Sequence, residues 1–122
     1  MRFIAGQFAL SRAARPEEVA RATTVAMRDA FPLMATADLV KIDIEGGEWP
    51  ILTDARLGEL AARAVALEFH PEGCPAGDAR AEAFRLLASA GFSLCDVPTL
   101  APAGYGALWA WREAREPVHA AA

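Results

Sequence analysis

Residues 37–52 read ADLVKIDIEGGEWPIL, and this stretch decides how the rest of the chain is interpreted. Its apolar first half predicts a buried β-strand over residues 39–44. Gly46 and Gly47 then predict a turn, and a short helix is expected to begin near Trp49. The stretch also holds the chain's only lysine and three carboxylates: Lys41, Asp43, Glu45 and Glu48. Charge gathered at the end of an apolar strand indicates either a functional site or a solvated sheet rim.

The composition limits the classes of protein to which the chain can belong. At 122 residues with 54% hydrophobic content, it is expected to form a single domain with its own core. A net charge of -4 argues against a nucleic-acid partner, which would need a basic face. No apolar run approaches the roughly 20 residues that span a bilayer, so no membrane association is expected. Cys74 and Cys95 lack metal-ligand spacing and are expected to be reduced thiols in a cytoplasmic protein.

Hydrophobic alternation and helical spacing predict an α/β fold. After residue 38 the expected order is strand, helix, strand, helix, strand, strand, over residues 39–45, 49–62, 64–70, 79–90, 92–97 and 105–112. Alternating strands and helices predict a mostly parallel sheet with helices packed on it. The last two strands have no helix between them, so the last strand is expected to be antiparallel. Before residue 38 we expect a strand within residues 1–10, a helical turn from Pro16, a short strand over 23–28 and a brief helix over 30–34.

Polar side chains stand at the carboxyl ends of the first two strands of this predicted sheet. Asp43 and Glu45 end the first, and Glu68 and His70 end the second. In open α/β sheets ligands bind beyond these strand ends, so we expect the four groups to converge. A carboxylate there could orient a hydroxyl or take its proton, and a histidine could act as a general base. The same set could instead ligate a divalent cation or form an ordinary polar rim.

Two neighbouring charges receive structural interpretations. Glu48 is interpreted as a carboxylate at the amino terminus of a helix, where the helix dipole favours it. Lys41 is expected to neutralise Asp43 or Glu45 along one face of the strand. Cys74 lies in a loop near the predicted site, but only His70 could activate it, so a catalytic thiol is not expected.

The run DLVKIDIEGGEWPIL resembles the FkbM family of S-adenosylmethionine-dependent methyltransferases, which carries a K-I-D-[IV]-E-G-x-E sequence. The segment ALEFHPEG resembles the next strand of that family, which often ends in Glu-x-His, here Glu68 and His70. The later segments GFSLCDV and YGALWAW fit the last two strands of a class I methyltransferase sheet. The resemblance covers residues 23–112 and implies a partial Rossmann-like class I methyltransferase sheet.

The resemblance also implies a reaction and roles for particular residues. The reaction is methyl transfer from S-adenosylmethionine to a hydroxyl of a small-molecule acceptor, such as a sugar or secondary metabolite. Asp43, Glu45 and His70 are the implied catalytic residues, Asp43 and Ile44 would contact the cofactor, and no metal ligand is implied. The glycine-rich half that holds the cofactor in this family has no counterpart here, so the chain is expected to correspond to the C-terminal half of the domain.

This correspondence leads to an expectation about partners. The strand over residues 39–44 is central in the intact fold, so here one of its edges is expected to be open. We expect residues 1–10, residues 23–28, self-association or a partner chain to cover that edge. Two alternative functions stay open, a non-catalytic interaction module and a metal-dependent hydrolase that uses Asp43, Glu45 and His70.

Overall fold

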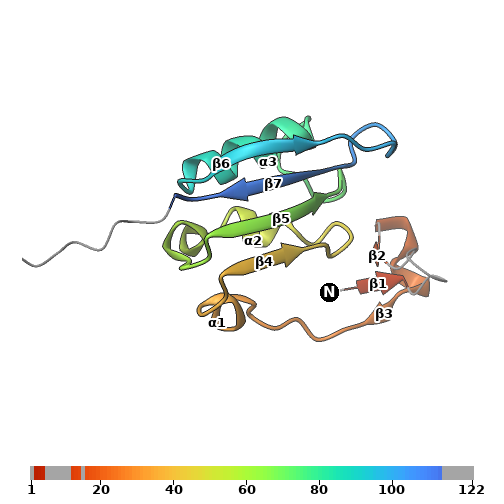
Figure 1. Cartoon of the computed structure of the whole chain (residues 1–122). Helices are drawn as coiled ribbons and strands as arrows, with labels where there is room; N and C mark the ends of the chain where they lie inside the picture. Colours follow the sequence, from red (N-terminus) through yellow and green to blue (C-terminus); the bar gives the residue numbers. More distant parts are fainter. Residues whose placement is uncertain (1, 5–11, 15, 114–122) are drawn as a thin grey trace, which may run out of the picture.

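A computed structural model of the chain describes residues 2–4, 12–14 and 16–113. Its main feature is a four-stranded sheet in the order β4 (Leu39–Ile42), β5 (Ala64–Phe69), β7 (Gly106–Trp111) and β6 (Ser93–Val97). Strands β4 and β5 are parallel, whereas β7 pairs antiparallel with both β5 and β6 (Figure 1). The predicted α/β class and the antiparallel last strand are therefore confirmed.

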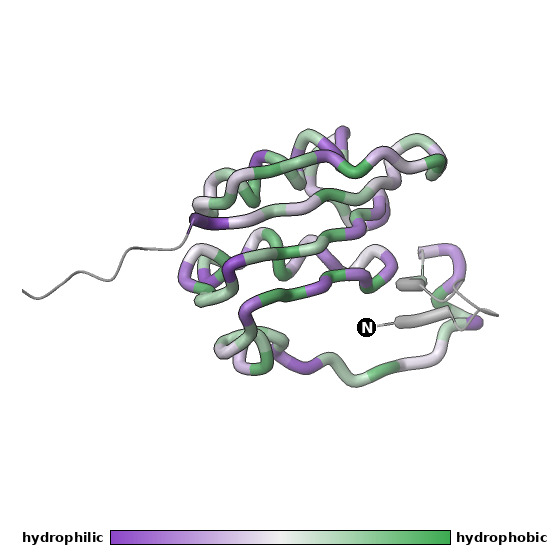
Figure 2. The backbone as a smooth tube through the Cα atoms, in the orientation of Figure 1, coloured by the Kyte–Doolittle hydropathy of each residue, from purple (hydrophilic) through white to green (hydrophobic). Residues whose placement is uncertain are grey.

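The helices that follow β4 and β5 lie behind the sheet in Figure 1, where α2 (Trp49–Leu52) and α3 (Ala79–Ser89) contact each other. A 3₁₀ helix, η2 (Ala55–Glu59), follows α2. Alternate strand residues pack under these helices and form the core: Val40, Ile42, Val65, Leu67, Phe69, Leu108 and Ala110. Residues between them, including Trp109 and Trp111, stay exposed on the opposite face of the sheet. Green, apolar segments along the strands in Figure 2 are accordingly interrupted by polar ones.

The N-terminal part of the chain forms a separate three-stranded sheet in the order β2 (Arg12–Ala13), β1 (Arg2–Ile4) and β3 (Thr23–Thr24). The 3₁₀ helix η1 (Pro16–Arg21) lies between β2 and β3, and α1 (Phe31–Met34) precedes β4. The strand predicted within residues 1–10 is thus present at 2–4, and its remainder lies outside the described residues.

Strand β4 has one partner strand, β5, among the residues that the structure describes. Of the two segments expected to cover its other edge, residues 2–4 and 23–24 form β1 and β3 of the separate sheet, and residues 25–28 line a groove together with β4. Residues 1 and 5–10 lie outside the described residues. One edge of β4 is therefore open in this part of the chain (Figure 1). An open edge of a parallel sheet presents unpaired backbone groups to any further strand.

Strand β4 ends at Ile42, earlier than the alternation predicted. Beyond it, Ile44 N donates to a carboxylate oxygen of Glu48 (3.2 Å), and Gly47 N donates to Ile44 O (3.1 Å). The backbone N–H and C=O of Ile44 therefore form hydrogen bonds within the turn and do not continue the β-sheet. Ile44 was expected to follow Ile42 into the core, and that expectation is wrong because its side chain is turned outward and is 46% exposed.

Arg112, directly after β7, ties the sheet to the ends of two helices. Its guanidinium donates to Leu60 O after η2 (2.6 Å) and to Ala90 O at the end of α3 (2.7 Å). The same group stacks on the ring of Phe92, 3.9 Å from its centroid. Carbonyls at helix ends lack partners within the helix, so one cation satisfies both ends.

We expect Arg112→Ala to lower the free energy of unfolding by about 2–3 kcal/mol, since it removes charge-assisted hydrogen bonds and leaves carbonyls unpaired. Urea denaturation followed by circular dichroism measures this change. Arg63→Ala is the matched control, because it shortens an exposed arginine side chain just before β5, and it should cost under about 0.5 kcal/mol. Equal losses in the two variants would contradict the role of Arg112.

Candidate functional site

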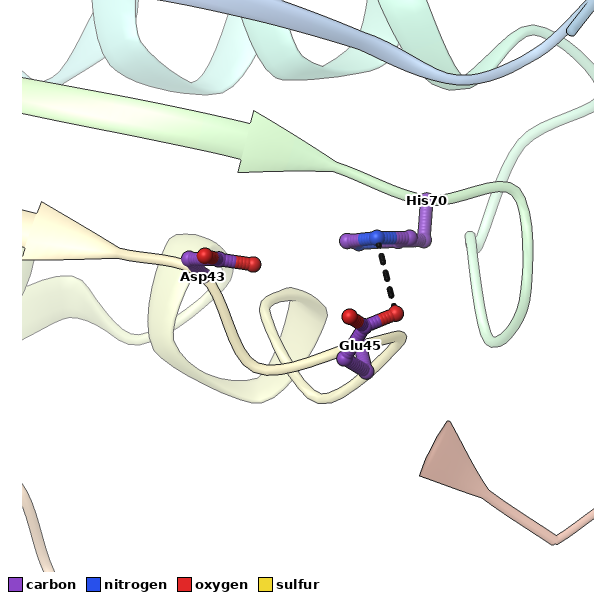
Figure 3. A group of neighbouring side chains, drawn as sticks. All are labelled: Asp43, Glu45 and His70. Atoms are coloured by element: carbon purple, nitrogen blue, oxygen red, sulfur yellow. Dashed lines mark ion pairs between the residues drawn. The ribbon is translucent and has the colours of Figure 1, made fainter. Parts of the chain in front are cut away.

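Three side chains from two neighbouring strand ends meet at the carboxyl edge of the sheet. Asp43 follows β4, Glu45 lies in the next turn and His70 follows β5 (Figure 3). One oxygen of each carboxylate and a ring nitrogen of His70 all lie within 4.8 Å of one another. His70 Nε2 lies 3.3 Å from Glu45 Oε2. These three residues, called the Asp43–Glu45–His70 cluster below, converge because β4 and β5 run parallel and end together.

Glu68, the fourth residue predicted to converge, does not join this cluster. It is exposed near the end of β5, and its Oε1 lies 3.4 Å from Lys41 Nζ. Lys41 also donates to Asp43 Oδ2 at 2.8 Å, as expected, although it makes no described contact with Glu45. Hydrogen bonds to Asp43 and then to Glu68 raise the pKa of Lys41, so its ammonium stays charged beside the cluster.

Glu48 is fully buried, and its carboxylate organises the turn. Both of its oxygens accept from Gly46 N (3.1 Å each), and one also accepts from Ile44 N (3.2 Å). The same oxygen lies 2.9 Å from His70 Nδ1. Glu48 does stand at the start of α2, as the sequence indicated, but the contact with His70 was not anticipated. In the sequence, the only signal of this contact was the position of Glu45 and Glu48 on either side of Gly46–Gly47. A turn at two glycines can direct one of the two carboxylates toward the interior.

His70 is buried, with 9% of its surface exposed. The strand predicted over residues 64–70 put His70 on the same face as Glu68, which is wrong because β5 ends at Phe69 and the chain turns there. Trp49 Nε1 donates to His70 O at 3.0 Å and fixes this turn against α2. An ionised Glu48 can only accept, so His70 Nδ1 is the donor and Nε2 is the atom presented to Glu45.

Glu45 has a left-handed backbone, with φ of 53°, and Gly46 follows with φ of 95°. A non-glycine residue pays a steric cost in this region, and such residues concentrate at functional sites. A side chain at Gly46 would also approach Glu72 Cβ within 3.1 Å. The turn therefore requires glycine at 46 and holds a strained glutamate at 45.

A groove of about 1130 Å³ runs along the open edge of β4. Its lining is largely apolar, and Asp43, Ile44 and Glu45 line one part of it, whereas His70 does not reach it. The lining also includes Asp29, Asp54 and Arg56, and Arg56 pairs with both carboxylates at 2.7 Å. Hydrogen bonds from Arg56 lower the pKa of Asp54 to about 2, so this ion pair persists at neutral pH.

The cluster carries an excess of negative charge. Asp43, Glu45 and Glu48 surround one imidazole, and Lys41 is the nearest cation that the described contacts provide. An apolar groove with convergent polar groups is the usual form of a small-molecule binding site.

The chain was compared with protein-family models, curated proteins and solved structures, and no match was found in any of them. Among the described residues, no helix is long and apolar enough to cross a membrane.

We expect Glu48→Ala to lower the free energy of unfolding by about 3–5 kcal/mol, since it strips two backbone N–H groups and a buried imidazole of their acceptor. Chemical denaturation measures the change. Glu59→Ala, at an exposed position of η2, is the matched control and should cost under about 0.5 kcal/mol. A cost for Glu48→Ala no greater than for the control would show that the buried carboxylate does not hold the turn.

Glu45→Gly should leave the stability unchanged or raise it by up to about 1 kcal/mol. Glycine relieves the left-handed strain, and this gain is partly offset by the greater freedom of glycine in the unfolded chain. Thermal and urea unfolding provide the measurement. Gly46→Ala is the opposing variant and should be destabilising at its positive φ. A clear loss of stability in Glu45→Gly would mean that Glu45 is retained for folding.

Proposed function

We propose that the chain takes part in S-adenosylmethionine-dependent methyl transfer to a hydroxyl of a small-molecule acceptor. The observation that carries the proposal is the fold of the KIDIEGGE run. This run forms a strand end and a locked turn that present Asp43 and Glu45 to an apolar groove, with His70 beside them. The run is also the segment that resembles the FkbM methyltransferases, and the resemblance assigns these same three residues.

The sheet topology supports the same proposal. The segments that resemble the closing part of a class I methyltransferase form α3, β6 and β7 in the expected order. Strand β7 lies between β5 and β6 and is antiparallel to both, and the pairing with β6 was expected from the absence of a helix between these two strands. The finer assignment as a Rossmann-like methyltransferase half is part of the proposal.

In this proposal the carboxylates act on the acceptor hydroxyl directly. Asp43 and Glu45 line the groove, so they can accept the hydrogen bond of a hydroxyl bound there, and one of them takes its proton. His70, which is fixed by Glu48, lies 3.3 Å from Glu45 Oε2 and would hold that carboxylate in place when a positive centre lies between the two atoms. The cofactor would supply an electrophilic methyl group.

The described residues fit S-adenosylmethionine in part. Asp43 and the exposed Ile44 line the groove where the resemblance places the cofactor. No glycine-rich turn between a strand and a helix stands beside the open edge of β4 in the described part of the chain. We therefore propose that polypeptide beyond these 122 residues, in the same chain or another, completes the cofactor site along that edge.

Two other functions predict different behaviour. An interaction module would use the open β4 edge alone, so substitutions of Asp43 and His70 would change only stability. A metal-dependent hydrolase would use the Asp43–Glu45–His70 cluster to activate water and would not need the methyl donor. The strained Glu45 favours a ligand site over the first of these, because such strain clusters at active sites, ligand clamps and switch regions.

Titration of ¹⁵N-labelled protein with S-adenosylmethionine tests the proposal. We expect saturable chemical-shift changes at Asp43 and Ile44, and binding about fivefold weaker in Asp43→Asn through the loss of one hydrogen bond. Glu68→Gln is the matched control, since Glu68 is a nearby carboxylate outside the groove, and it should bind like the native chain. Absence of shifts in the groove at millimolar cofactor would contradict cofactor binding by these 122 residues alone, and equal weakening in both variants would contradict the placement of the cofactor at Asp43.

A further inference from the structure

Both ring nitrogens of His70 face carboxylates. Nδ1 lies 2.9 Å from Glu48 Oε1, and Nε2 lies 3.3 Å from Glu45 Oε2. If Nδ1 donates to the buried Glu48 and the ring is neutral, Nε2 carries a lone pair. That lone pair then faces the Glu45 carboxylate oxygen, which is also an acceptor. Two acceptors at this distance repel each other unless a positive centre lies between them. That centre is either a proton on Nε2 or a metal ion.

We infer that the Asp43–Glu45–His70 cluster is a binding site for a divalent metal ion. One oxygen from each carboxylate and Nε2 of His70 would be the ligands. An oxygen of each carboxylate and a ring nitrogen of His70 lie within 4.8 Å of one another, and Nε2 is 3.3 Å from Glu45 Oε2. The inference deepens the proposed methyl transfer and rests on it for the role of the ion. Binding of the ion does not depend on that function.

Glu48 gives the site the support that metal-binding histidines usually have. A histidine ligand commonly donates its second ring N–H to a carboxylate, which fixes the tautomer and the direction of the free nitrogen. Here the supporting carboxylate is fully buried and is held by Gly46 N and Ile44 N. Nε2 is therefore held toward the Glu45 carboxylate before any ion binds. This support distinguishes the cluster from a chance gathering of surface acids.

The ligand set indicates the kind of ion. Two carboxylates and one imidazole suit Mn²⁺, Fe²⁺ or Zn²⁺ better than Ca²⁺, which prefers oxygen ligands alone. Asp43 and Glu45 are partly exposed, with 30% and 33% of their side chains accessible, so they can rotate to close on the ion. Three protein ligands also leave coordination positions open for a substrate oxygen.

The open position gives the ion a role in the proposed reaction. A hydroxyl oxygen bound to the ion becomes more acidic, because the cation stabilises the negative charge that develops. Its O–H bond breaks and the proton passes to the carboxylate oxygen of Glu45 that does not bind the ion. The oxygen then forms a bond to the methyl carbon of the sulfonium donor, whose C–S bond breaks to leave a neutral thioether, and Glu45 releases its proton to water.

The test is calorimetric titration of the chelator-treated full chain with Mn²⁺ alone, without cofactor or acceptor. We expect one saturable site per chain. Binding should fall at least about tenfold in Glu45→Gln and in His70→Ala, and about 10- to 100-fold in Glu48→Gln, which alters the supporting shell. Glu45→Gln changes a partly exposed side chain, so it stays informative if the variants at buried positions fail to fold. Circular dichroism checks the fold of each variant.

Two control variants separate this site from general attraction to acidic surfaces. Glu68→Gln removes a nearby carboxylate outside the cluster, and His119→Ala removes the chain's other histidine. The dissociation constant of each variant for Mn²⁺ should stay within about twofold of that of the native chain, whereas the cluster variants should lose at least about tenfold in affinity. Lack of saturable binding by the native chain, or equal weakening in Glu68→Gln and Glu45→Gln, would overturn the inference. Binding without methyl transfer would leave the metal site standing and count against the proposed reaction alone.

Discussion

The hydrogen bonds of the buried Glu48 carboxylate are the interaction on which the rest of the site depends. Removing a carboxylate from water is costly unless its oxygens find donors. Here the donors are two backbone N–H groups of its own turn and the ring of His70, which comes from the next strand. One side chain thus connects the end of β4, the start of α2 and the end of β5. The positions of Asp43 and Glu45 follow from that connection.

The carboxylates of the turn divide into one that holds the structure and two that face the groove. Glu48 is buried, so a ligand cannot reach it, and its oxygens already accept hydrogen bonds from the protein. Asp43 and Glu45, in contrast, are partly exposed. Glu45 is also kept in a left-handed backbone conformation that costs stability. Proteins commonly accept such costs where a side chain must be aimed, so stability and function would conflict at this residue.

The sheet was predictable because its signal is local. Val65, Leu67 and Phe69 alternate with smaller or polar residues, and they are buried as predicted. The prediction failed at Ile44 and His70, where alternation was extended past the end of a strand. Here the strand is followed by a turn in which Ile44 N donates to Glu48. Hydrophobic periodicity does not report such a hydrogen bond, so it cannot show where the strand ends. The pairing of Glu48 with His70 joins residues that are distant in sequence, and no periodic pattern reports such a contact.

The state of the His70 ring is the most direct measurement of how this site is built. Nitrogen-15 NMR of histidine-labelled protein, with His119→Ala used for assignment, reports which ring nitrogen carries a proton. The structure predicts a protonated Nδ1, held by Glu48, in the metal-free protein and after any ion binds at Nε2. A ring whose Nδ1 lacks a proton would contradict the fixed orientation of His70, on which the proposed site depends.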